Sequence, residues 1–178
     1  MAEKIADPGL SEDKVAIQLP LALTAGAEKP YFLHGDSRAP VNLWLWRSGT
    51  AENHAGVSLA TARGIADRDI RDAAEVGLNG KGSYQDGTWQ VVLRRPLMTA
   101  DLSQDLQFHE GTFIPIAFSV WDGSNSENDS AHTLTTWYWL LLKPPPGNAP
   151  WLFAGLAFVL MLLGQAWWAR TAQRRQRS

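Results

Sequence analysis

Two short stretches contain side chains that could take part in chemistry by their type and spacing. Asp101 and Asp105 lie four residues apart, and paired carboxylates can act as general acid and base. Ser124, Asn125 and Ser126 follow a turn, where a serine could serve as a nucleophile. The two aspartates fall in a predicted loop, where such pairs are usually solvated, and the sequence offers no identifiable base for the serines. It therefore contains no clear signal for hydrolytic or transfer chemistry.

Several other chemistries are excluded by motif and composition. The sequence contains no G-x-S-x-G, no P-loop, no G-x-G-x-x-G and no histidine pair at metal-binding spacing. Cysteine is absent, which excludes disulfides, cysteine-ligated zinc or iron–sulfur clusters, a c-type haem attached through C-x-x-C-H, and cysteine nucleophiles. The net charge of −2 disfavours a nucleic-acid binder. A composition of 45% hydrophobic and 19% charged residues indicates a packed core rather than disorder.

A long uncharged segment lies near the C-terminus. Trp151 to Ala169 carries no formal charge and would form a helix of about 28 Å, close to the hydrocarbon thickness of a bilayer. Trp151 at one end and Trp167 and Trp168 at the other suit the two interfacial belts. A buried core helix of this length would normally show a polar face. We therefore predict a transmembrane helix over 151–169.

The charges on either side of this segment predict its orientation. All 18 acidic residues and 12 of the 16 basic residues lie before residue 150, which gives residues 1–150 a net charge of −6, whereas four arginines follow residue 169. By the positive-inside bias, the basic tail 170–178 is predicted to be cytoplasmic. A domain over 1–143 would then be periplasmic, joined by a proline-rich stalk over 144–150 to a single pass of the inner membrane. Because residues 1–14 contain no apolar core for export, we expect a mature or shortened chain, or a natural protein that is longer at its N-terminus.

The part before the stalk has mainly β patterning. Alternating or continuous β-rich runs predict five strands, out of about six in all: 14–23, 41–47, 88–95, 113–121 and 134–142. Asp-Gly pairs at 86–87 and 122–123 are turn signals. One short helix is predicted over Ile65 to Val76, and Gly77, Gly80 and Gly82 predict a flexible loop after it. The fold class is therefore mainly β, an antiparallel β-sandwich with a short helix and a C-terminal transmembrane helix.

Six stretches, in order along residues 12 to 144, resemble one family. They are KVAIQLPLAL (14–23), KPYFLHGD (29–36), PVNLWLW (40–46), DGTWQVVLRRPL (86–97), FIPIAFSVWDGSNSE (113–127) and TTWYWLLLKP (135–144). Together they resemble the haem b-binding domain of ethylbenzene dehydrogenase-like proteins. That family includes the gamma subunits of periplasmic molybdenum enzymes of the dimethyl-sulfoxide-reductase family and membrane-anchored cytochrome relatives. The resemblance implies a β-sandwich that holds one non-covalent haem b and transfers electrons.

The resemblance also implies the iron ligands. In the gamma subunits a Met and a Lys hold the iron, and the family's lysine position falls on Lys143. The family's P-F-x-M-G-like stretch falls on P-Y-F-L-H-G, which places His34 where the family has its Met. His34 and Lys143 are therefore the first hypothesis for the axial pair, with Met98 the next candidate and His109 the third. Each also has an ordinary interpretation: a solvated Lys143, a turn at His34, core packing at Met98 and an exposed turn at His109.

Further residues could complete a haem pocket. Arg94 and Arg95 could bind the propionates, because guanidinium groups pair well with carboxylates, or they could simply be a solvated strand end. Trp44 and Trp46, which alternation places on one face, could line the porphyrin or pack the core. The other tryptophans with the same two interpretations are Trp89, Trp121, Trp137 and Trp139.

One departure leaves the function open. Domains of this family usually carry further strands upstream, with a W-x-D-like motif that this sequence lacks, so the domain could be incomplete, shortened or completed by a partner. The first hypothesis is a membrane-anchored b-type cytochrome subunit that relays single electrons in a periplasmic respiratory complex. A cofactor-free accessory or scaffold subunit is the alternative, and a carbohydrate-binding sandwich ranks below both.

The expected partners are redox proteins in a hetero-oligomeric complex. The donor or acceptor could be a c-type cytochrome, a molybdenum or iron–sulfur subunit, or a quinone-linked subunit. The net charge of −6 over residues 1–150 would favour a basic partner through electrostatic steering.

Overall fold

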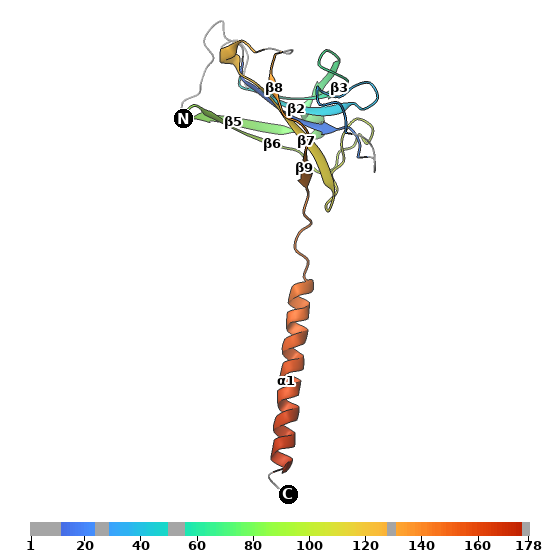
Figure 1. Cartoon of the computed structure of the whole chain (residues 1–178), viewed down its shortest axis with the longest axis vertical. Helices are drawn as coiled ribbons and strands as arrows, with labels where there is room; N and C mark the ends of the chain where they lie inside the picture. The colour runs from blue at the N-terminus through green and yellow to red at the C-terminus, as the bar shows by residue number, and fades with distance from the viewer. Residues whose placement is uncertain (1–11, 24–28, 50–55, 128–130, 176–178) are drawn as a thin grey trace. The chain divides into compact units, whose positions relative to one another are not determined.

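A computed structural model describes residues 12–23, 29–49, 56–127 and 131–175 of the chain. The chain divides into two compact units, Met1–Lys143 and Pro144–Ser178. The first unit is an antiparallel β domain and the second contains one long helix (Figure 1). The prediction of a mainly β fold with a C-terminal apolar helix is therefore confirmed.

The larger sheet of the β domain has seven strands. Along the chain these are β1 (Lys14–Pro20), β2 (Val41–Arg47), β3 (Gly56–Ala62), β4 (Arg68–Asp72), β7 (Phe113–Trp121), β8 (Thr133–Leu134) and β9 (Tyr138–Leu141). The strand order is β4-β3-β2-β1-β7-β8, and β9 also pairs with β7. Every pairing is antiparallel, and the strand order places β1 between β2 and β7 at the centre of the sheet.

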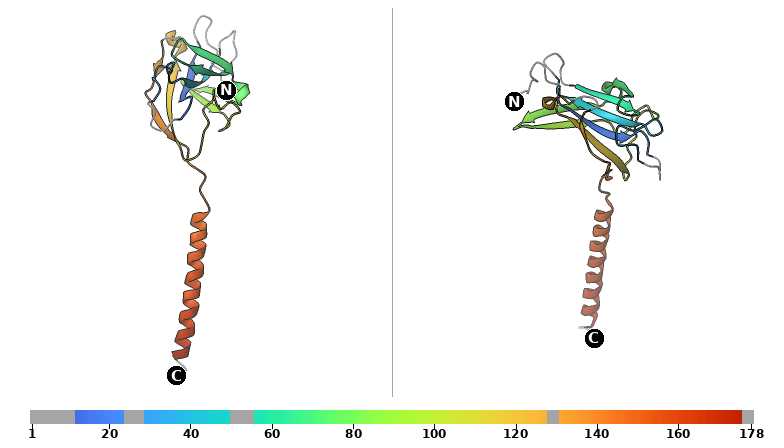
Figure 2. Two further views of the ribbon diagram at one scale, coloured as in Figure 1. Left: turned by 90° about the vertical axis from the view of Figure 1, so that its right-hand side faces the viewer. Right: turned by 45° about the horizontal axis from the view of Figure 1, so that its top comes forward.

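A second, two-stranded sheet covers part of one face of the larger sheet. It consists of β5 (Asn79–Gln85) and β6 (Thr88–Arg94), joined at the predicted Asp86-Gly87 turn. Trp46 of β2 contacts Trp89 of β6 edge to face, with ring centroids 4.9 Å apart. The hairpin is seen beside the larger sheet from two further directions in Figure 2.

The two faces of the larger sheet bury different clusters. Beneath the hairpin and the loop 95–112, one face buries a cluster that includes Leu19, Trp44, Leu59, Phe108 and Ile114. The opposite face buries mostly small side chains together with Trp137, whose indole N–H donates to the carbonyl of Pro30 at 2.7 Å. The loop 29–40 therefore lies against this second face. Trp44 and Trp137 belong to different clusters, so their faces do not meet around a common pocket.

Three predicted elements differ from the observed ones. The predicted helix over Ile65 to Val76 is wrong: 68–72 form β4, which pairs with β3, and only Ala73–Val76 forms a 3-10 turn. The predicted strand over 134–142 is divided into β8 and β9. The predicted loop at Gly80 and Gly82 is wrong as well, because both belong to β5.

The glycines of β5 are required by close packing rather than by flexibility. A Cβ atom added at Gly82 would lie 2.1 Å from Cζ2 of Trp46, whose side chain is buried and cannot move aside. Replacement of Gly82 by alanine is therefore expected to lower the free energy of unfolding by about 1–3 kcal/mol, the usual cost of overpacking. Chemical denaturation measures the change. Ser83→Ala, one position along the same strand, should have little effect; equal losses in both variants would contradict the packing argument.

The helix of the second unit, α1 (Ala149–Arg175), contains a candidate membrane span over Ala149–Arg170 with a mean hydropathy of 1.8. Its side chains from Ala149 to Arg170 are all exposed, which excludes a core helix within this unit. By length and composition the helix can cross a bilayer.

Candidate functional site

His34 lies in the loop between β1 and β2 and is fully buried. Its backbone is left-handed, with φ of 62°, and Gly35 follows with φ of 73°, so a tight turn directs the imidazole toward the sheet. Nε2 lies 3.3 Å from the Ser119 hydroxyl of β7. The turn expected at His34 is present, but its side chain is packed rather than solvated.

The histidine belongs to an aromatic stack that the sequence did not predict. The ring of His132 stacks on both His34 and Trp121, with centroids 5.2 Å and 4.5 Å away and interplanar angles near 20°, and the centroids of His34 and Trp121 are themselves 6.2 Å apart. Both ring nitrogens of His132 are buried. The stack joins the loop 29–40 to the C-terminal end of β7. Nε2 of the buried His34 is directed at Ser119.

Lys143 is exposed and lies near the opposite end of β7 from His34. The preceding residue, Leu142, donates its N–H to the carbonyl of Thr112, just before β7 begins. From Thr112 to Ser119 the chain rises about 23 Å, at 3.3 Å per residue. Two residues that hold one haem iron would have to lie close together, and this conformation does not bring His34 and Lys143 together.

The other two ligand candidates lie at the same end as Lys143. Leu97, which precedes Met98, accepts a hydrogen bond from the N–H of Phe108, and Gly111 donates to the carbonyl of Leu142. The short segment 108–111 therefore runs between Met98 and Lys143 and contains His109. All three side chains are exposed, Met98 at 50%. A thioether, an imidazole and an amine, each able to ligate haem iron, are thus gathered at one end of the β domain.

The two arginines predicted to bind propionates diverge. Arg94 is exposed at the end of β6, whereas Arg95 is buried. The Arg95 guanidinium donates to the carbonyl of Leu106 and lies over the rings of Trp44 and Phe108, at 5.0 and 4.8 Å. Burial lowers the pKa of Arg95, an effect that the charge of Asp105 opposes. Of the pair, only Arg94 is accessible to a ligand in this structure.

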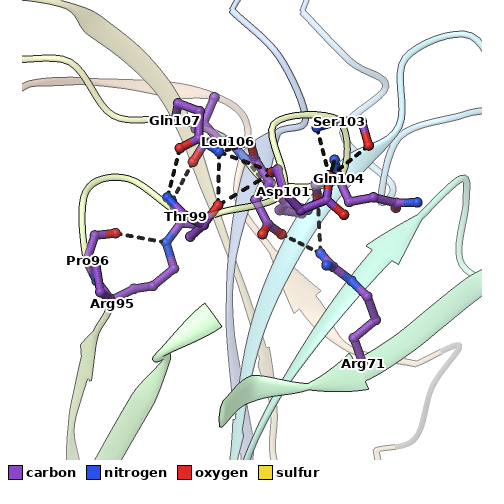
Figure 3. A network of polar contacts seen from close by, with 11 residues as sticks. Arg71, Arg95, Pro96, Thr99, Asp101, Ser103, Gln104, Leu106 and Gln107 are labelled. Carbon is purple, nitrogen blue, oxygen red and sulfur yellow. Dashed lines mark hydrogen bonds and ion pairs between the residues drawn. The ribbon is translucent and has the colours of Figure 1, made fainter. Parts of the chain in front are cut away.

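A polar network holds the loop 95–108, which carries Met98, against the sheet (Figure 3). Arg71 reaches from β4 and forms an ion pair with Asp105, whose side chain is fully buried. Asn42 of β2 bonds both neighbours of Asp105: its amide donates to the carbonyl of Gln104 and accepts from the N–H of Leu106, each at 2.9 Å. The interpretation of Asp105 as solvated is therefore wrong. Its role here is to anchor the loop.

Asp101 remains exposed, as the sequence predicted, and caps a turn. Hydrogen bonds from Ser103 and from the N–H of Gln104 lower the pKa of its carboxyl group. Ser124 similarly donates to Asp122 within the turn after β7. These contacts give the candidate catalytic residues local structural roles.

Trp44 and Trp46 lie on one face of β2, as alternation predicted, and both are buried in the core. Trp44 packs edge to face on Phe108, and Trp46 on Trp89. Packing thus accounts for the positions of both side chains.

The comparisons with known proteins identify the class of this β domain. A family model described as ethylbenzene dehydrogenase matches residues 58–133, from β3 to the start of β8. This match and the relatives below confirm the resemblance of the chain to ethylbenzene dehydrogenase-like gamma subunits.

Three relatives are subunits of oxidoreductases. The chain is 32% identical over 160 residues to a protein of Haloferax mediterranei named as a respiratory nitrate reductase heme subunit. This alignment covers 87% of the present chain and 54% of that protein. It is 34% identical over 109 residues to the chlorate reductase subunit gamma of Ideonella dechloratans, covering 60% of this chain and 41% of the relative. It is 29% identical over 122 residues to the dimethylsulfide dehydrogenase subunit gamma of Rhodovulum sulfidophilum, covering 67% and 44%. The chain thus spans about half the length of these relatives.

Proposed function

We propose that the chain is a membrane-anchored b-type cytochrome subunit that relays single electrons in a respiratory complex. The observation that carries this proposal is the match over 87% of the chain to a protein named as a heme subunit of a respiratory reductase. The candidate span in α1 supports anchoring in the inner membrane. We further propose that the β domain is periplasmic and the tail 170–178 cytoplasmic, in accordance with the positive-inside bias.

The ligand pair that the geometry supports best is Lys143 with Met98. These donors match the Met and Lys of the family resemblance, and both are accessible at the same end of the domain. His109, between them along the surface, is the second candidate, whereas His34 packs against Ser119. A bound haem b would supply a one-electron redox couple. Lys143 would have to be neutral to ligate it, so its proton must be released on binding.

The rest of the domain would position these donors. Arg71, Asn42 and Asp105 hold the loop of Met98 on the sheet, and the pairing of β9 with β7 fixes the chain just before Lys143. Arg94 is the accessible arginine of the predicted propionate pair. Electrons would pass to or from a c-type cytochrome, a molybdenum or iron–sulfur subunit, or a quinone-linked subunit of a hetero-oligomeric complex.

An optical spectrum tests this proposal. The full chain, purified in detergent and reconstituted with haem, is expected to give a b-type reduced-minus-oxidised spectrum and a b-type pyridine haemochrome. A low-spin, six-coordinate signature would support two protein ligands. A chain that stays colourless under the same conditions would favour the cofactor-free scaffold subunit. The packing of His34, at the aligned ligand position, favours that second function.

A further inference from the structure

An apolar surface is exposed on β7 and β9, immediately before the stalk. Antiparallel register places Phe113 opposite Leu141 and Pro115 opposite Trp139, so the side chains of Phe113, Trp139 and Leu141 share one face. Their exposed fractions are 61%, 58% and 38%. We call these three residues the β7–β9 apolar surface.

Two lysines accompany this surface. The Lys29 ammonium lies 4.7 Å from the ring centroid of Trp139, and Lys143 is exposed two residues after Leu141. Tryptophan favours the interface between lipid and water, because one part of its ring system is apolar and its N–H is polar. Lysine side chains place their stems along apolar surface while the ammonium reaches the headgroups. This composition fits a lipid surface better than the interior of a protein interface, from which lysine is depleted.

The covalent connection keeps this surface close to the membrane. Only residues 144–148 separate Lys143 from the start of α1 at Ala149, so the two ends of the stalk are at most about 20 Å apart, even when fully extended. The limit follows from chain length alone. Such a short tether gives the surface a high effective concentration at the headgroups, which allows weak contacts to be occupied.

We propose that the β7–β9 apolar surface docks onto the headgroup region of the membrane. Trp139 and Phe113 would lie at the interface, with Lys29 contacting anionic headgroups. This inference rests on the proposed membrane anchoring by α1. Docking would hold the end of the domain that carries Met98, His109 and Lys143 near the bilayer, where membrane-bound redox partners are reached.

The absence of cysteine makes a direct test possible, since a single introduced cysteine takes one probe. Leu141→Cys and, independently, Phe113→Cys would carry an environment-sensitive fluorophore on the proposed surface. Ile70→Cys is the matched control, because Ile70 is an exposed apolar residue on β4, at the other edge of the sheet. Val159→Cys, within the candidate span, reports whether α1 is inserted. The full chain is placed in phosphatidylcholine vesicles with and without phosphatidylglycerol, and spin-labelled lipids serve as quenchers.

The expected result is blue-shifted emission at positions 113 and 141 and strong quenching there by headgroup spin labels. Quenching should increase with phosphatidylglycerol, whereas position 70 stays unquenched. If position 159 is quenched by acyl-chain labels but 113 and 141 are not, α1 is anchored and the docking proposal fails. If position 159 is also unquenched, the proposed anchoring itself fails. Bound haem or a partner subunit could instead protect the cysteines at 113 and 141 from the fluorophore. If this happens without quenching by lipid labels, the surface belongs to that occupant and the docking proposal is overturned.

Discussion

Replacement of Lys143 by alanine in the haem-loaded chain is expected to convert the six-coordinate low-spin spectrum to a five-coordinate one. Lys143 is exposed at the end of the domain where Met98 and His109 also lie, so its amine is available as a ligand. Axial ligands set haem potentials over a range of about 0.8 V, and loss of one should shift the midpoint by on the order of 0.1 V. Absorption spectroscopy and a potentiometric titration measure both changes.

Matched variants separate ligation from general damage. Lys81→Ala removes an exposed lysine of β5 and should leave the spectrum and potential unchanged. Met98→Ala should reproduce the loss of the sixth ligand, and His109→Ala should not. If His109→Ala has the effect instead, His109 and Lys143 are the pair.

His34→Ala distinguishes the structural interpretation of this histidine from the one predicted by alignment. Because His34 is buried against Ser119 and His132, the variant should lower stability while the haem of the folded fraction keeps its signature. Loss of the signature in His34→Ala but not in Lys143→Ala would refute the assignment made here.

The parts of the fold that the sequence could predict are those with large alternating side chains. The strand over 41–47 alternates leucine with tryptophan, and its predicted bounds match β2. Strand β3 was missed because it contains small residues such as Ser58, Ala60 and Ala62, which give little contrast between its faces. The sequence predicts a loop in place of β5, because the reason for its glycines, the ring of Trp46, lies on another strand.

The candidate site could be predicted only as a set of residue types. Which of them lie together depends on loops that fold over the sheet, and the local sequence does not encode that placement. His34 and Lys143 occupy the aligned positions, yet His34 contacts Ser119 near one end of β7, whereas Leu142, next to Lys143, bonds Thr112 just before the other end. Arg94 and Arg95 are adjacent in sequence and have opposite environments. Alternation leaves Arg94 exposed at the end of β6, whereas Arg95 points the other way and is buried against the ring of Phe108. The sequence predicts a solvated Asp105 because its ion-pair partner, Arg71, lies 34 residues earlier and is not visible in the local pattern.

Removal of the Asp105 carboxylate should produce a large loss of stability. Asp105→Ala would leave the guanidinium of Arg71 without its buried counter-charge and would remove the charge that opposes the desolvation of Arg95. Breaking a buried pair on one side typically costs about 3–5 kcal/mol, because the remaining charge is uncompensated. Denaturation of the full chain in detergent, followed by tryptophan fluorescence, would measure the change. Asp101→Ala, in the same loop but exposed, should cost much less, because water can replace the hydrogen bonds that its carboxylate accepts.

The double variant Asp105→Leu with Arg71→Met tests whether charge or shape is responsible. Apolar replacement of both partners is often neutral, so much of the loss should be recovered. No recovery would mean that the hydrogen bonds of Arg71, including the one to the carbonyl of Gln104 at 3.2 Å, contribute more than the ion pair. The same loop carries Met98, and this links stability to the proposed function. If Met98 is a ligand, the folded fraction of Asp105→Ala should show a weakened sixth ligand and Asp101→Ala should not, even though neither aspartate would touch the haem.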